Sequence, residues 1–178
     1  DELKYIIESI EEEGILEEQE SEMVQSALEF DEKTALEILT PRVDVVLIDA
    51  QDDAQTIRNT IITERYSRIP VYEDNIDNII GILNIKDYLI QARASGFDKV
   101  DIRSILRKAY FVPETKNIDS LFVEFQKEKQ HIAILIDEYG GFSGIVTMED
   151  IIDAIRNDIV PGKEYLDKML EYRATYGV

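Results

Sequence analysis

The sequence contains one motif twice, as GILNIKDYL at residues 81–89 and as GIVTMEDII at residues 144–152. In both copies a glycine opens an apolar run and an aspartate stands six residues after it, at a constant offset of 63 residues (144 − 81 and 150 − 87). A motif that recurs at a fixed offset is typical of a chain built from repeated supersecondary units. With 178 residues, the chain is long enough for two such units to bury a sizeable core.

Each copy has the same order of predicted elements, β-α-β-β-α. In the first copy, residue patterns predict strands at 43–49, 67–73 and 79–83 and helices at 54–64 and 85–94. In the second copy, they predict strands at 109–114, 131–137 and 142–146 and helices at 118–129 and 148–159. One such unit is too small to bury a good core alone, whereas two packed face to face can do so. We therefore expect an α/β (α+β) fold of two tandem repeats packed as a pseudo-twofold pair.

We divide the chain into four parts: an acidic helical linker segment (1–39), the first repeat (40–96), the second repeat (97–160) and a helical tail (161–178). Residues 1–32 carry thirteen acids and one base, Lys4, with apolar residues at helical spacing. This pattern predicts solvated amphipathic helices, and the alternative is an acidic surface that attracts divalent cations. The segment has no dedicated metal-binding loop, and we assign no residue as a metal ligand.

Composition excludes several classes of function. The formal net charge is −19, from 19 basic and 38 acidic residues, so a nucleic acid partner is not expected. The chain has no cysteine and therefore no disulfide or thiolate nucleophile. It has no apolar run long enough to cross a membrane. Because the sequence begins with Asp1, we expect it to be a piece of a longer protein whose membrane part lies outside it.

Thr147 and Asp150 stand where an apolar strand gives way to a helix. Their spacing predicts a capping box, in which each side chain bonds the backbone of the other residue. The same position suits a nucleoside phosphate, because a helix N-terminus attracts phosphate and a carboxylate accepts both ribose hydroxyls. For the phosphates we assign Arg68, whose guanidinium binds phosphate oxygens bidentately. The alternative is a surface Arg68 that pairs with Glu73 or Asp74.

Three stretches carry a family resemblance. LTPRVDVVLID (39–49), YSRIPVYED (66–74) and DEYGGFSGIVTMEDI (137–151) resemble the tandem CBS domains of the CorC/HlyC family of haemolysin-related membrane proteins, which are linked to magnesium and cobalt efflux. The resemblance covers residues 30–156. In that family the CBS pair is cytoplasmic and follows a transmembrane domain through an acidic helical segment, a place that residues 1–32 fit. A further C-terminal domain, frequent in the family, is not recognisable in residues 160–178.

The resemblance implies an adenine nucleotide as ligand, AMP or ATP, with Mg²⁺ as a candidate companion. Related CBS pairs bind phosphates through a Tyr-Ser/Thr-Arg sequence, which assigns Ser67 beside Arg68. An apolar slot for adenine is expected between the first strand of a copy and the strand before Thr147, with ordinary core packing as the alternative for each lining residue. The predicted nucleotide-binding residues are Thr40, Tyr66, Ser67, Arg68, Tyr110, Phe111, Val112, Ile145, Thr147 and Asp150.

The second position of the repeat is expected to be weak. Asn84 stands in place of Thr147, and His131 stands in place of Arg68. A neutral histidine is a poorer partner for phosphate than an arginine. We therefore predict one good site and a weak or empty second site formed by Asn84, Asp87 and His131.

The leading hypothesis is a non-enzymatic regulatory module that binds an adenine nucleotide and controls an attached membrane ion-transport domain from the cytoplasmic side. A hydrolase using Glu149 and Asp150 is the rival, but neighbouring helical residues point about 100° apart and do not converge on one atom. The third hypothesis is a dimerisation domain with a lapsed nucleotide site. We expect a homodimer through apolar helix faces formed by Ile57, Ile61, Leu89, Leu121, Phe125 and Ile152.

Overall fold

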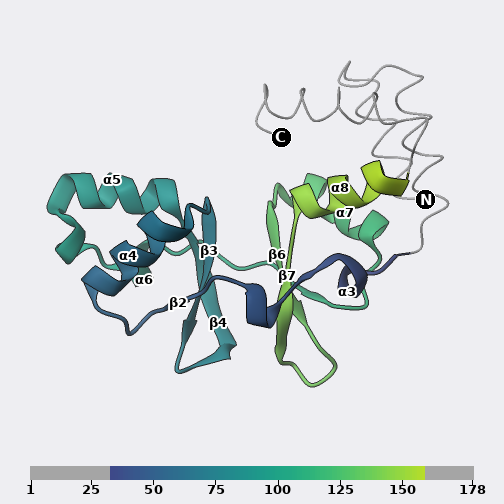
Figure 1. Ribbon diagram of the computed structural model, residues 1–178, viewed down its shortest axis with the longest axis horizontal. Coiled ribbons are helices and arrows are strands. Elements are labelled where there is room, and N and C mark those ends of the chain that lie inside the picture. The colour runs from purple at the N-terminus through teal and green to yellow at the C-terminus, as the bar shows by residue number, and fades with distance from the viewer. Residues whose placement is uncertain (1–32, 159–178) are drawn as a thin grey trace, which may run out of the picture. The chain divides into compact units, whose positions relative to one another are not determined.

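The computed structural model describes residues 33–158 (Figure 1), so the helices predicted for residues 1–32 and for the tail 161–178 lie outside the described residues. Contacts divide the chain into two compact units. In the described residues, unit 1 contains 33–39, 113–133 and 146–158, and unit 2 contains Thr40–Val112 and Ile134–Ile145. The first repeat therefore lies in unit 2, whereas the second repeat contributes to both units.

A three-stranded sheet forms the centre of the first repeat. It has the order β2-β3-β4, with β2 (Ile48–Asp49) parallel to β3 (Arg68–Glu73) and β3 antiparallel to β4 (Asn75–Asn84). The helices α4 (Ala54–Glu64), α5 (Ile85–Ser95) and α6 (Ile102–Ile105) lie together on one side of these strands (Figure 1). Their apolar faces and the sheet enclose a core of Ile48, Ala50, Ile57, Ile61, Ile69, Val71, Leu83, Tyr88 and Ile102.

The segment before α4 departs from its predicted structure. A strand was expected over residues 43–49, but residues Arg42–Asp44 form the 3-10 helix η1 and only Ile48–Asp49 form a strand. The chain must turn here because β1 (Thr40–Pro41) pairs with β7, whereas β2 pairs with β3. Val43 is accordingly 85% exposed, so its β-branched side chain contributes nothing to a sheet. Two short elements at the start of the second repeat, η2 (Phe97–Lys99) and α6, were also not predicted.

The glycine that opens the first motif has a packing role. A β-carbon on Gly81 would lie 2.9 Å from Cβ of Leu106 and 3.0 Å from the carbonyl oxygen of Arg107. The chain approaches closely here because Arg107 and Ile82 exchange two backbone hydrogen bonds, each 2.9 Å long. The absence of a side chain at Gly81 thus lets the segment after α6 lie against β4.

Replacing Gly81 with alanine should lower the free energy of unfolding by about 1–3 kcal/mol, the usual cost of overfilling a packed position. The added methyl group must push against the backbone of Arg107, which is held by its bonds to Ile82. Urea denaturation followed by circular dichroism measures the change. An unchanged midpoint would mean that the neighbouring segment yields without cost.

The second sheet has four strands in the order β1-β7-β6-β5. Its other strands are β5 (Phe111–Pro113), β6 (Ile132–Ile136) and β7 (Phe142–Thr147). β1 runs antiparallel to β7, with Thr40 opposite Ile145 and Pro41 opposite Gly144. The N-terminal strand of the first repeat is therefore paired with the last strand of the second repeat.

Unit 1 is built around two helices of the second repeat, α7 (Ile118–Glu128) and α8 (Met148–Asp158), which contact each other. Their buried side chains include Phe122, Phe125 and Ile151. The short helix α3 (Ala35–Ile38) joins this unit through backbone bonds between Ala35 and Lys116 (2.7 Å) and between Ile118 and Lys33 (2.9 Å). The segment that precedes the first repeat is thus attached to the second.

The two copies share details that the pattern alone did not specify. Arg65 and Lys129, 64 residues apart, both adopt a left-handed backbone (φ 58° and 53°) at the ends of α4 and α7. Both helices contain eleven residues, as do α5 and α8. The prediction of two tandem α/β repeats is confirmed.

The residues chosen for a dimer interface are mostly core residues. Ile57, Ile61, Leu121, Phe125 and Ile152 are buried within the chain, so their selection as an apolar outer face was wrong. Helical periodicity identifies an apolar face but does not reveal what covers it. Leu89 alone of the six is exposed, at 55%.

Candidate functional site

The start of α8 has the predicted capping box. The carboxylate oxygen Oδ2 of Asp150 accepts a hydrogen bond from the Thr147 N–H (2.9 Å), and Oγ1 of Thr147 accepts one from the Asp150 N–H (3.2 Å). Met148, which follows Thr147, donates its N–H to the carbonyl oxygen of His131 (3.0 Å). Both capping residues are half-buried. Within the described residues, Oδ1 of Asp150 makes no hydrogen bond and can accept one from a ligand.

The equivalent position at the start of α5 is organised differently. Asn84 caps the helix through the Lys86 N–H (3.0 Å), and Asp87 does not reach back to it. Instead, Asp87 forms a two-pronged ion pair with Arg107, with Nε to Oδ2 at 2.9 Å and Nη2 to Oδ1 at 3.2 Å. These bonds lower the pKa of the Asp87 carboxyl group from its ordinary value. The two motif aspartates therefore have different partners.

The ion pair between Asp87 and Arg107 should make a small, pH-dependent contribution to stability. Because folding lowers the pKa of Asp87, the contribution is present above the unfolded value of about 3.9 and is lost as pH falls through the lower folded value. At pH 7, Arg107→Met should lower the free energy of unfolding by about 0.2–1 kcal/mol, as is usual for an exposed pair. Urea denaturation between about pH 7 and pH 2.5 measures this difference.

Lys108→Met is the matched control, since Lys108 is an exposed neighbouring cation without an ion pair in the described part of the chain. Its effect on stability should depend much less on pH. A difference between wild type and Arg107→Met that persists unchanged in acid would contradict the assignment.

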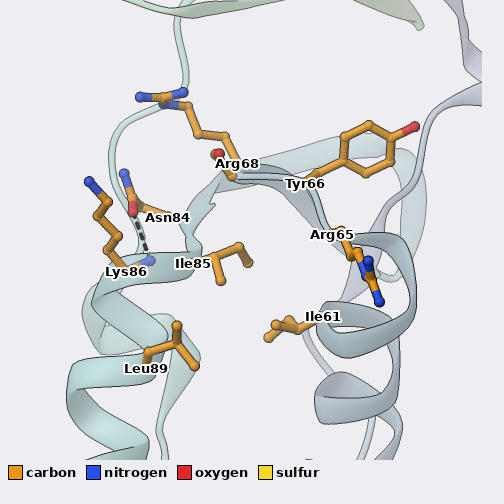
Figure 2. Close-up of a pocket in the computed structure, with 9 residues that line it drawn as sticks. Ile61, Arg65, Tyr66, Arg68, Asn84, Ile85, Lys86 and Leu89 are labelled. Carbon is orange, nitrogen blue, oxygen red and sulfur yellow. Dashed lines mark hydrogen bonds between the residues drawn. The ribbon is translucent and has the colours of Figure 1, made fainter. Parts of the chain in front are cut away.

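Arg68 lies in a pocket of about 330 Å³ within unit 2 (Figure 2). It stands opposite Asn84 in the ladder between β3 and β4, which brings the start of β3 beside the start of α5. In Figure 2 the side chains of Arg68 and Lys86 extend on the same side as Asn84, and Arg65 lies across the pocket near Ile61. The lining residues are Ile61, Arg65, Tyr66, Ser67, Arg68, Asn84, Ile85, Lys86 and Leu89.

The cations of this pocket lack acidic partners. The side chains of Arg65, Arg68 and Lys86 form no ion pair or hydrogen bond with any residue between 33 and 158. The pairing of Arg68 with Glu73 or Asp74 is not observed, because Glu73 binds Arg103 (2.8 Å) and Asp74 binds Gln51 (3.1 Å). Three unpaired cations in a chain of net charge −19 form a site suited to an anion.

Arg65 and Lys86 were not among the predicted site residues. A signal for Lys86 was present in the repeat, because Glu149 occupies its place in the second copy (149 − 86 = 63). Likewise His131 occupies the place of Arg68. Two of the three cations, Arg68 and Lys86, thus have no cationic counterpart in the second copy, whereas Arg65 corresponds to Lys129. The second copy has the aspartate with an available oxygen.

The remaining predicted residues lie on the four-stranded sheet. Thr40 is paired with Ile145, which stands two residues before Thr147 on β7. β5 is separated from β7 by β6 and carries Val112, which is buried, and Phe111, which is 50% exposed. The Tyr110 carbonyl oxygen, just before β5, accepts a bond from the Ile134 N–H (2.8 Å).

The predicted nucleotide-binding residues fall into two groups. Thr40, Tyr66, Ser67, Arg68, Tyr110, Phe111, Val112 and Ile145 belong to unit 2. Thr147 and Asp150 belong to unit 1, as does His131 of the predicted weak second site, while Asn84 and Asp87 belong to unit 2. The structure brings Tyr66, Ser67 and Arg68 together in one pocket, and it joins Thr147 to Asp150 through the capping box.

Comparison with known proteins identifies the family. The model of the CBS domain matches residues 35–91 and again residues 101–157. A solved CBS domain of a bacterial CNNM/CorC family Mg²⁺ transporter, in complex with ATP, is 39% identical, with a TM-score of 0.70, and the match covers 79% of this chain and 99% of that one. The chain belongs to the CBS-domain family, as a tandem pair of the type found in CNNM/CorC transporters.

Two further relatives bear on the ligand and on the length of the whole protein. A CBS-domain pair from Klebsiella pneumoniae with bound AMP is 31% identical, with a TM-score of 0.63, over 68% of this chain and 97% of that one. Hemolysin C of Brachyspira hyodysenteriae is 42% identical over 144 residues, 81% of this chain. The chain spans 52% of the length of that relative.

None of the helices between residues 33 and 158 is long and apolar enough to cross a membrane. In the same part of the chain, no three His, Asp or Glu side chains are grouped so as to hold a metal ion.

Proposed function

We propose that this chain is a regulatory module that binds an adenine nucleotide, AMP or ATP, and thereby controls an attached ion-transport domain in the membrane. The observation that carries the proposal is the pocket around Arg68, whose three cations have no acidic partner among the described residues. The CBS pairs solved with ATP and with AMP support an adenine nucleotide as the anion.

Each part of the nucleotide has a proposed partner. Asp150 accepts the ribose hydroxyls through its available oxygen Oδ1, and Thr147 lies at the helix start beside it. Arg68 binds the phosphates together with Ser67, and Lys86 adds a second positive charge to the same pocket. For the adenine we propose an apolar slot lined by Tyr110, Phe111, Val112 and Ile145. Thr40 and Tyr66 are further proposed contacts of the nucleotide.

The proposed role is non-enzymatic. Glu149 is exposed, whereas Asp150 is half-buried and engaged in the cap of α8, so these two neighbours do not act as a catalytic pair. The module is proposed to lie on the cytoplasmic side of the membrane, where adenine nucleotides are available. The attached transport domain would then respond to nucleotide bound by the CBS pair.

A thermal-shift titration tests the proposal. A ligand that binds only the folded chain raises its melting temperature, by an amount that corresponds to about 2.7 kcal/mol at a hundred times the dissociation constant. AMP, ADP and ATP should therefore raise the melting temperature, and GTP at equal concentration should raise it less. An absence of any shift with all three adenine nucleotides would leave the dimerisation domain as the better hypothesis.

We also propose that the chain forms a homodimer through the outer faces of α4 and α5. Ile62, Leu89 and Ile90 lie on these two helices and are all more than half exposed, as is Tyr66, two residues after the end of α4. A symmetric pair that buries about 1,600 Å² in total around such residues would have the size of a standard stable interface.

Leu89→Ala should weaken this dimer about tenfold, because each copy of the interface loses apolar contact area at two symmetry-related positions. Sedimentation equilibrium at several concentrations measures the change. The control is Val43→Ala, which removes an exposed apolar side chain outside α4 and α5. A wild-type chain that sediments as a monomer at tens of micromolar would contradict the proposal.

A further inference from the structure

We propose that Arg107 closes the nucleotide position of the first repeat, so that the chain binds one nucleotide where the repeat would otherwise provide two positions. This inference rests on the proposed function, because it concerns the same ligand. It starts from the contrast between the two motif aspartates. Asp150 keeps one carboxylate oxygen available, whereas both oxygens of Asp87 are bonded to Arg107.

A ribose needs the oxygens that Arg107 occupies. The guanidinium approaches Asp87 with two parallel N–H donors, a geometry that uses both oxygens and adds the attraction of opposite charges. Ribose hydroxyls are neutral donors, and they would have to displace the charged guanidinium of Arg107 from the Asp87 carboxylate. Asp87 is therefore a poor receptor for a ribose although its place in the motif matches that of Asp150.

The backbone fixes Arg107 at this place. Ile82 and Ile145 occupy the same position of the repeat (145 − 82 = 63), and each pairs with a residue from the N-terminal part of a repeat. The partner of Ile145 is Thr40, whose side chain is short, whereas the partner of Ile82 is Arg107. Because the main chain of Arg107 is held by two bonds to Ile82, only its side chain must be ordered to reach Asp87.

The neighbouring residues indicate what would bind once Arg107 is removed. The helix start is capped by the Asn84 side chain, as the start of α8 is capped by Thr147. In the sequence of the second copy, His131 takes the position of Arg68, and a neutral histidine is a weaker phosphate partner than an arginine. The opened position should therefore accept an adenine nucleotide with lower affinity than the position that contains Asp150.

The test is to count AMP molecules bound per chain, by equilibrium dialysis at saturating AMP, for wild type and for Arg107→Thr. The substitution places a threonine opposite Ile82, as Thr40 stands opposite Ile145. We expect one AMP per chain for wild type and two for Arg107→Thr. Lys108→Thr removes a neighbouring exposed cation with no ion pair in residues 33–158, and it should leave the count at one.

A double variant, Asp87→Asn with Arg107→Thr, should return the count to one, which links the new position to the Asp87 carboxylate. Arg107→Gln removes the charge and keeps most of the side-chain length, and it should also raise the count. This variant separates the loss of the ion pair from the loss of side-chain volume. A count of one for both Arg107 variants, or weaker binding of the first AMP, would overturn the inference while leaving the proposed function intact. A wild-type chain that binds no AMP would overturn both.

Discussion

Replacing Asp150 with asparagine should weaken the binding of an adenine nucleotide about ten- to a hundredfold. A hydrogen bond to a charged group contributes about 1.5–3 kcal/mol, and the asparagine amide offers the ribose a neutral acceptor in place of the carboxylate. The amide oxygen can still accept the Thr147 N–H, so the cap of α8 should survive. The melting temperature without ligand should therefore change little while the affinity measured by calorimetry falls.

Asp87→Asn is the matched control for this prediction, because Asp87 holds the same place in the first copy of the motif. Its carboxylate is already bound by Arg107, so its loss should leave the affinity for AMP and ATP nearly unchanged. Equal losses from the two substitutions would show that the ranking of the two positions is wrong.

Replacing Arg68 with alanine should weaken ATP binding more than AMP binding, and added Mg²⁺ should recover part of the ATP affinity. Arg68 has no acidic partner in the described residues, so its charge is available to phosphates. ATP carries more negative charge than AMP into a chain of net charge −19. A divalent cation that bridges the phosphates offsets part of that repulsion. For the same reason, wild type should bind ATP more tightly with Mg²⁺ than without it.

Calorimetry of ATP and AMP with Mg²⁺ or with a chelator, at constant ionic strength, separates specific bridging from screening. Arg93→Ala is the matched control, since it removes the same charge from the exposed last turn of α5 without touching the pocket. If Mg²⁺ leaves ATP affinity unchanged or lowers it while Arg68→Ala abolishes binding, Arg68 neutralises the phosphates alone and Mg²⁺ has no role in the module.

The repeat predicted the elements of the fold because its signals are local. The helix expected at 54–64 has those bounds, and α8 begins at Met148 as expected. The capping box of Thr147 and Asp150 was also predictable, since its two residues are three positions apart and bond only each other. Short-range spacing of this kind is visible in the sequence without knowledge of the tertiary contacts.

The features that sequence reasoning missed depend on partners distant in the chain. Arg107 lies 20 residues from Asp87, on a segment without a periodic apolar pattern. The motif therefore did not predict their ion pair. The same holds for the five residues that are buried among the six assigned to a dimer interface. Their helical spacing was correct, but whether Ile57 or Leu121 meets another helix or a second chain is decided by packing. The residue types of the site were therefore predictable from the sequence, whereas the residues that those side chains contact were less so.

The most direct test of the proposed function is calorimetric titration of AMP and of ATP into the wild-type chain, followed by competition between the two. We predict saturable binding of one nucleotide per chain for each ligand, with ATP displacing AMP. Two nucleotides per chain would contradict the ranking of the positions. If neither nucleotide produces heat or raises the melting temperature at millimolar concentration, the module does not bind adenine nucleotides and the central claim fails.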